Sequence, residues 1–197
     1  MAEATPSTLE RETASGIAGY GNRLPPGRHA PGSHCAWSVQ LIRVYRICDR
    51  RYSKSAFDGE GARLYGGRWN PVGLPMVYTS GSISLAILET LVNIQDPEDL
   101  PGKLVIIPAD LPDGLPLRRF DSKSLPPQWR TPTISRITQE LGKRWFLEDG
   151  EVVVAVPSVV VLTESNYLIN PRHTGFSRIL VHKPQRLHFD PRLLGSL

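Results

Sequence analysis

The chain has 197 residues, of which 40% are hydrophobic and 21% are charged, and its formal net charge is +4. A chain of this size and composition indicates a soluble globular protein with one domain, or at most two small ones. The mild positive charge is compatible with anionic ligands, but no run of five lysines or arginines occurs, so direct nucleic-acid binding is not predicted.

Cysteine content and hydropathy narrow the class of protein further. Cys35 and Cys48 are the only cysteines, and neither belongs to a CxxC pair, so we predict no metal site. No apolar run approaches the length of a membrane span, and the N-terminal region lacks the apolar core of a signal peptide. These features predict a cytoplasmic protein that does not contact a membrane.

Residues 1–37 differ in composition from the rest of the chain, because they are rich in glycine and proline and show no sustained apolar period. We interpret them as a flexible N-terminal extension, with the folded domain at 38–197. The first strand is predicted at 39–47, where alternation places one arginine among apolar residues on each face, Arg43 or Arg46.

Residues 51–75 have the pattern of a long polar loop, and 76–80 that of a short strand leading into a helix at 82–94. Helical spacing puts Leu85, Leu88 and Val92 on one face of that helix together with Glu89. A carboxylate inside an apolar stripe needs a partner, so Glu89 is either half of a structural ion pair with an arginine or part of a functional site.

The remaining elements complete a mixed pattern. They are a strand at 103–111, a helix at 131–146 with Ile134, Ile137, Leu141 and Trp145 on its buried side, an apolar strand at 151–163 that Pro157 and Ser158 interrupt, and closing antiparallel strands at 177–183 and 186–190. Strands and helices do not alternate strictly, so we predict a compact α/β (α+β) fold with a mixed sheet rather than a doubly wound parallel sheet.

Four further residues are candidates for a site. Arg46 and Arg68 each present a fork of donors suited to phosphate or carboxylate, although either could be solvated or could neutralise Glu89. The two glycines of GGRWN, residues 66–70, allow Arg68 a close approach to an anion. Tyr78 is either a stacking platform or a core tyrosine with its hydroxyl satisfied, and Ser158 is a hydrogen-bond partner for a ligand or for Glu89.

Other motifs are absent or weak. No G-x-S-x-G elbow surrounds Ser158, no Walker A loop is present, and no G-x-G-x-x-G follows a strand. His173 in NPRH is a loop residue for which we favour a structural role over that of a general base.

Several separate stretches resemble the RES domain family, which supplies the toxins of bacterial toxin–antitoxin pairs. In chain order they are VYRI, GGRWNPVG, VYTS, SLAILE, VPSVVV, NYLINPRH and FDPRL, and the resemblance covers about residues 39–193. The resemblance implies a fold related to ADP-ribosyltransferases that acts on NAD. Ordinary ADP-ribosyltransferases carry the key glutamate on a strand, whereas here Glu89 is predicted on a helix.

By position, the resemblance implies that Glu89, Arg68 and Tyr78 are catalytic and that these three residues bind NAD together with Arg46 and Ser158. It implies NAD cleavage with depletion, with inorganic phosphate or water as acceptor; ADP-ribosylation of a cellular protein is the alternative. A ribonuclease-like toxin and a non-catalytic binding module are further alternatives. The expected partners are an antitoxin with a helix-turn-helix DNA-binding region and a second copy of the chain.

Overall fold

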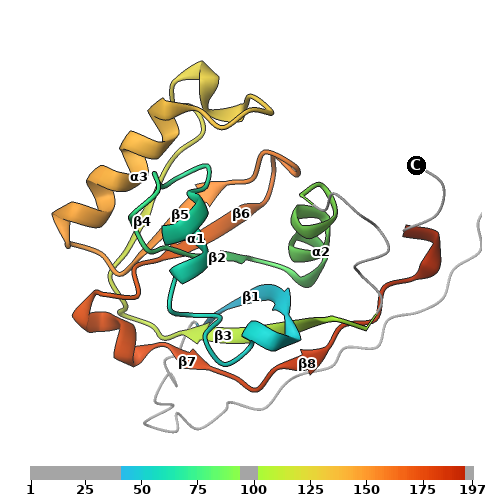
Figure 1. The fold of residues 1–197 in the computed structure, drawn as a ribbon. Helices are drawn as coiled ribbons and strands as arrows, with labels where there is room; N and C mark the ends of the chain where they lie inside the picture. Colours follow the sequence, from blue (N-terminus) through green and yellow to red (C-terminus); the bar gives the residue numbers. More distant parts are fainter. Residues whose placement is uncertain (1–40, 94–101, 194–197) are drawn as a thin grey trace, which may run out of the picture. The chain divides into compact units, whose positions relative to one another are not determined.

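The structure is a computed structural model, and it describes residues 41–93 and 102–193. The predicted extension at 1–37 lies outside the described residues, and the domain boundary therefore stays a prediction. The predicted mixed α/β class is confirmed, because a curled sheet and a small number of helices form the described part of the chain (Figure 1).

The sheet contains eight strands within the described residues. They are β1 (Ile42–Asp49), β2 (Val77–Ser80), β3 (Leu104–Leu111), β4 (Leu117–Arg119), β5 (Val153–Pro157), β6 (Ser165–Ile169), β7 (Leu180–Val181) and β8 (Gln185–Arg186). Their order is β4-β5-β6-β2-β1-β3-β7, and β8 also pairs with β3. All neighbouring strands are antiparallel except β4 and β5.

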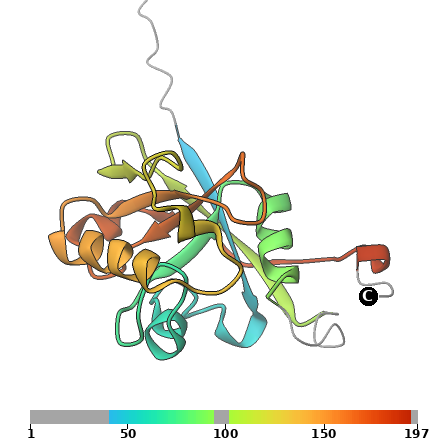
Figure 2. The same cartoon turned by 90° about the horizontal axis from the view of Figure 1, so that it is seen from above.

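Three α-helices accompany the sheet in the described part: α1 (Glu60–Tyr65), α2 (Ile83–Leu91) and α3 (Arg136–Glu148). Short 3-10 helices lie at Arg50–Tyr52, Pro127–Arg130, Thr174–Arg178 and Pro191–Leu193. Figures 1 and 2 show α2 and α3 well apart from each other. Ser82 caps α2 by accepting a hydrogen bond from the Leu85 amide, and Ser135 caps α3 by accepting one from the Ile137 amide, as hydroxyl side chains at N-caps commonly do.

Most predicted elements are confirmed, but several need correction. The closing strands predicted at 177–183 and 186–190 are only the two-residue strands β7 and β8. The polar loop predicted at 51–75 contains α1, which is only six residues long and too short for a helical apolar period to reveal it. The apolar strand predicted at 151–163 ends at Pro157, where the chain turns. The prediction also missed β4 and β6; β4 is only three residues long, and β6 begins with polar residues.

The predicted buried faces of both long helices need correction. On α2, Leu88 and Val92 are exposed, and the fully buried residues are Leu85 and Ala86. On α3, the predicted Ile134 precedes the helix and is exposed, as is Ile137, whereas the predicted Trp145 is buried together with Thr138, Gly142 and Phe146. An amphipathic stripe is broad, and the line along which a helix meets its neighbours selects only part of it.

Two hydrophobic clusters form the core, and β5 contributes to both. Val153 and Ala155 belong to the cluster that also contains Val44, whereas Val154 and Val156 belong to the cluster around Trp145. Because alternate residues of a strand face opposite sides of a sheet, β5 is buried on both faces, which explains its continuous apolar sequence. The two clusters support a sheet whose β1, β2, β5 and β6 carry the candidate site.

Candidate active site

One cavity of about 810 Å³ brings four of the five predicted site residues together. Arg46, Arg68, Tyr78 and Glu89 line it, and the fifth residue, Ser158, is fully buried and contacts Glu89. The cavity volume lies within the range of about 300–1,000 Å³ that is usual for small-molecule sites. These residues come from β1, the GGRWN loop, β2, α2 and the end of β5, so the tertiary fold assembles them.

The Glu89 carboxylate is held by hydrogen bonds and not by an arginine. Its Oε1 accepts one bond from the Ser158 hydroxyl at 2.7 Å and one from the Asn166 side-chain amide at 2.6 Å. Among the described residues, Glu89 forms no ion pair, so the structural ion pair considered from the sequence is not what holds it. The predicted hydrogen bond between Ser158 and Glu89 is confirmed.

Ser158 is itself fixed by the turn that follows β5. Its Oγ accepts hydrogen bonds from the backbone amides of Val160 and Val161, both at 3.0 Å. The single hydroxyl proton is therefore directed to Glu89. The same turn also holds the start of α2, because the Ser82 hydroxyl donates to Glu164 at 2.7 Å. The turn thus fixes α2 at its N-cap and again at Glu89.

Arg46 is a cation without a carboxylate partner among the described residues. One terminal nitrogen donates to the backbone carbonyl of Tyr78 at 2.9 Å, and the buried Nε has no hydrogen-bond partner. Burial lowers the pKa of Arg46, while Cys48 and Asp58 nearby oppose this effect. The ordinary pKa of arginine is so high that the group stays charged at neutral pH. A half-buried charge of this kind is an anion-binding candidate.

Arg68 has a different set of partners. Its guanidinium donates to the backbone carbonyls of Trp129 at 3.1 Å, Thr131 at 2.8 Å and Pro132 at 3.2 Å. Burial lowers the pKa of Arg68, and the nearby charge of Glu89 opposes that shift. Arg68 therefore supports the segment before α3 and still presents a positive charge to the cavity.

The structure explains why positions 66 and 67 of the GGRWN loop are glycines. Gly66 adopts a φ of 71°, in the left-handed region that favours glycine. A Cβ on Gly67 would lie 2.5 Å from the Tyr78 hydroxyl oxygen, so only glycine lets the loop come this close. The loop therefore packs closely against β2, and Arg68 lies in the wall of the cavity.

The Tyr78 hydroxyl is occupied within the protein. It donates to the Asn70 side chain at 2.7 Å and accepts a bond from the Trp69 amide at 3.0 Å. Burial raises the pKa of the Tyr78 phenol. These contacts favour the interpretation of a tyrosine with a satisfied hydroxyl, and they leave stacking by the ring as a prediction.

Trp69 and α3 hold the loop from the other side. Trp69 is buried against the Phe120 ring, with ring centroids 5.8 Å apart. On α3, Gln139 donates to the carbonyls of Gly67 and Asn70, and a Cβ on Gly142 would lie 1.8 Å from the Trp69 carbonyl oxygen. A glycine inside α3 is thus required by this close approach and not by helix formation.

Sequence reasoning missed two asparagines. Asn166 lies at the cavity and binds Glu89. The fully buried Asn70 donates to the backbone carbonyls of Pro71 and Leu74 in its own loop and of Ala62 in α1. Each occurs inside a quoted motif, but nothing distinguishes a buried asparagine from an exposed one in a polar stretch. His173 lies outside the cavity, and its Nδ1 accepts a hydrogen bond from the Gly175 amide, which fits the structural role we favoured.

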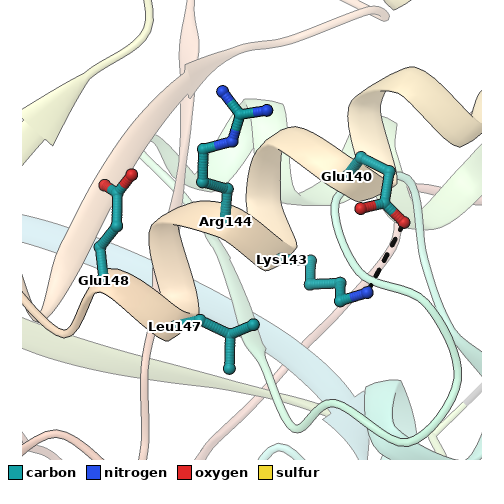
Figure 3. Close-up of a pocket in the computed structure, with 5 residues that line it drawn as sticks. All are labelled: Glu140, Lys143, Arg144, Leu147 and Glu148. Carbon is teal, nitrogen blue, oxygen red and sulfur yellow. Dashed lines mark ion pairs between the residues drawn. The ribbon is translucent and has the colours of Figure 1, made fainter.

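A smaller hollow of about 310 Å³ lies on the outer surface of α3 (Figure 3). It is lined by Glu140, Lys143, Arg144, Leu147 and Glu148, and Lys143 pairs with Glu140 at 3.8 Å. All five residues come from one helix, and their side chains diverge in Figure 3 instead of converging on a point. It is not a candidate site.

Within residues 41–93 and 102–193, no group of three or more histidine, cysteine, aspartate or glutamate side chains could hold a metal ion. None of the helices in the same ranges is long and apolar enough to span a bilayer.

Comparison with protein families agrees with the motifs. The sequence model of the RES domain matches residues 43–190. This chain belongs to the RES domain family. That match includes all five predicted site residues and Asn166.

Bacterial relatives share most of this RES domain. "Toxin Res" of Photorhabdus laumondii is 37% identical over 155 residues, which is 78% of this chain and 97% of that protein. "Toxin Res" of Yersinia enterocolitica is 38% identical over 77% of this chain and 99% of its own length. The "Prs ADP-ribosylating toxin" of Sphingobium sp. is 33% identical over 74% of this chain and 91% of its own length.

A solved structure supports the fold assignment. The RES domain chain resembles a chain of the M. tuberculosis MbcT–MbcA toxin–antitoxin complex with a TM-score of 0.62, covering 79% of this chain and 88% of the other. The sequence identity is 21%, so this likeness concerns the fold.

Proposed function

We propose that this RES domain chain is the toxin of a toxin–antitoxin pair and that it cleaves the bond between nicotinamide and ribose in NAD. The observation that carries the proposal is one cavity that contains both Arg46, which has no carboxylate partner among the described residues, and Glu89, whose carboxylate those residues hold through one oxygen, Oε1. NAD offers a pyrophosphate to the first and a ribose that becomes cationic to the second. The relatives' names support the toxin assignment, and one of them, an ADP-ribosylating toxin, supports a reaction that involves ADP-ribose.

Glu89 is the group that would favour bond cleavage. When nicotinamide leaves, positive charge develops at the ribose carbon, and a carboxylate already placed beside it stabilises that charge without reorganisation. Oε1 is engaged by Ser158 and Asn166, whereas the described residues provide no hydrogen bond to Oε2. Oε2 is therefore available for a ribose hydroxyl or for the developing cation.

The two arginines would have different roles in binding NAD. Arg46, with its unsatisfied Nε, is the stronger candidate for direct pyrophosphate binding. Arg68 is held by three carbonyls and would add positive charge while keeping the wall of the cavity in place. The Tyr78 ring would contact nicotinamide or its ribose, and Ser158 would orient the carboxylate.

The acceptor of ADP-ribose distinguishes two versions of the proposal. We place NAD depletion first, with inorganic phosphate or water as acceptor. Transfer to a cellular protein is the second candidate, and the name of the Sphingobium relative, an ADP-ribosylating toxin, favours it. Either version needs the same cleavage step at Glu89.

The proposal includes partners. A cognate antitoxin with a helix-turn-helix region would neutralise the toxin, and two copies of the chain would pair within that complex. The reaction would take place in the cytoplasm, where NAD is abundant. Direct contact with nucleic acid or membrane is not part of the proposal.

The test is to incubate the purified chain with NAD, with and without phosphate, and to separate the products. Nicotinamide release with ADP-ribose-1″-phosphate formed only when phosphate is present would identify a phosphorylase, and ADP-ribose in both conditions would identify a hydrolase. Glu89→Gln should abolish release, whereas Glu140→Gln, on the exposed face of α3, should not. Intact NAD would contradict free cleavage, and labelled NAD with cell lysate would then test transfer to a protein.

A further inference from the structure

We propose that Asn166, oriented by Ser80, is a positioning residue for the Glu89 carboxylate. This inference rests on the proposed function of the cavity, because it assigns Asn166 the task of aiming the carboxylate at the ribose. Asn166 lies on β6 and Ser80 at the end of β2, and the two are paired in the register of those strands. Both residues line the cavity.

A chain of hydrogen bonds runs from β2 to α2. The Ser80 hydroxyl donates to Oδ1 of Asn166 at 2.7 Å, and Nδ2 of Asn166 donates to Oε1 of Glu89 at 2.6 Å. The opposite orientation of the amide would place Oδ1 against a carboxylate oxygen, which is repulsive. Ser80 therefore favours the one orientation in which Asn166 can donate to Glu89.

Ser158 alone does not fix the direction of the carboxylate. It supplies one donor to Oε1, and a single hydrogen bond leaves the carboxylate free to swing about that contact. Asn166 supplies a second donor to the same oxygen from a different strand. Two donors from β6 and the end of β5 hold Oε1 between two points and direct Oε2 away from them.

The backbone at Asn166 does not depend on its side chain. β6 pairs with β2 on one side and with β5 on the other, so the register places Asn166 opposite Ser80 and opposite Val156. Removing the side-chain amide should therefore leave the strand in place. A purely structural role predicts the contrary, namely loss of folding in step with loss of activity.

The experiment compares Asn166→Asp, Asn166→Ala, Ser80→Ala and the double variant S80A/N166A with the wild-type chain. Asn166→Asp keeps the size of the side chain but turns a donor toward Glu89 into an acceptor. We expect kcat for NAD cleavage to fall about 10- to 100-fold in both Asn166 variants, with KM changed less than about threefold, and the melting temperature of Asn166→Ala to stay nearly constant. Asn166→Asp should have a lower melting temperature, because it places a second carboxylate against that of Glu89. Ser165→Ala, next to Asn166 on β6 and outside the network, is the matched control and should behave as wild type.

The double variant tests whether Ser80 acts through Asn166. Ser80→Ala alone should slow the reaction less than Asn166→Ala, and it should cause no further loss in the Asn166→Ala background, since residues that act as a unit are not additive. If the kcat of the double variant falls by the product of the two single losses, Ser80 does not act through Asn166. If Asn166→Ala has the wild-type kcat, Asn166 is not a positioning residue.

Growth arrest after induction in bacteria provides a readout that assumes no particular reaction. The same ranking of variants is expected there. Wild-type arrest without any use of NAD would reject the proposed reaction, while the ranking of the variants would still support or overturn the role of Asn166.

Discussion

The Ser158 hydroxyl lies 2.7 Å from Oε1 of Glu89, although the two residues are 69 positions apart in the chain. The contact joins the turn after β5 to the C-terminal half of α2. The contact belongs to a small hydrogen-bond network, because the backbone amides of Val160 and Val161 donate to the same Ser158 oxygen. A serine and a glutamate far apart in the sequence thus form one hydrogen-bonded unit.

Ser158→Ala should damage both folding and activity. The substitution leaves the amides of Val160 and Val161 without their acceptor in a buried turn, so we expect a loss of about 1–3 kcal/mol in the free energy of unfolding. Activity should fall as well, because Glu89 loses one of its two donors. Urea denaturation and NAD turnover measure the two effects. Ser124→Ala removes an exposed hydroxyl that donates only to the nearby Asp121 carbonyl, so it should change neither the free energy of unfolding nor NAD turnover.

Arg46→Met should weaken function without weakening the fold. A half-buried charge that has no carboxylate partner among the described residues costs stability, so its replacement by an apolar side chain should be neutral or should stabilise the protein by about 1 kcal/mol. Binding of NAD, measured by calorimetry, should be lost. Arg43→Met is the matched control on the same strand; there the guanidinium pairs with Asp110, and the melting temperature should fall. Equal melting temperatures for the two variants would contradict this reading.

Tyr78→Phe tests the role of the Tyr78 hydroxyl separately from that of the ring. We expect the variant to lose about 1–2 kcal/mol of stability, because the Trp69 amide and the Asn70 side chain lose their shared partner. NAD turnover should fall only modestly if the ring supplies the substrate contact. A complete loss of activity in a folded Tyr78→Phe protein would instead show that the hydroxyl takes part in the reaction.

Gly142→Ala should be strongly destabilising. The new Cβ would lie 1.8 Å from the Trp69 carbonyl oxygen, and neither backbone can move without separating α3 from the GGRWN loop. Overpacking of this kind costs about 1–3 kcal/mol or more. Gly150→Ala, just after α3, meets no atom within 4 Å and should be tolerated. Thermal unfolding of the two variants side by side measures the difference.

Acid should weaken the fold through Asp110. The hydrogen bonds from Arg43, together with His182, lower the pKa of Asp110 to about 2. A carboxyl with a depressed pKa in the folded state adds stability above its ordinary pKa and loses it as the pH falls toward the folded value. The melting temperature should therefore drop between about pH 4 and pH 2, and Asp110→Asn should have a lower melting temperature at neutral pH and a flatter profile in that window. An unchanged profile in Asp110→Asn would contradict this.

Local sequence was sufficient for much of the fold. The alternation in β1 and the apolar residues of β5 are properties of neighbouring residues, and they predicted that these two strands exist. The motifs around Arg46, Arg68 and Glu89 also marked residues that prove to share one cavity. Charged side chains among apolar neighbours are informative because burying them without a purpose is costly.

Local sequence could not predict which side chains contact each other across the fold. Leu88 and Val92 are exposed although they extend the apolar stripe of α2, because the contact of that helix with the sheet covers only Leu85 and Ala86. Arg43 and Arg46 have nearly identical settings in the sequence, yet the strand pairing places Arg43 beside Asp110, whereas Arg46 forms no ion pair with any carboxylate in the described part of the chain. Asn166 reaches Glu89 only because β6 lies between β2 and β5. The sequence alone determined which side chains had to find partners, whereas the tertiary structure decided which partners they found, because a hydrogen bond depends on distance in space and not along the chain.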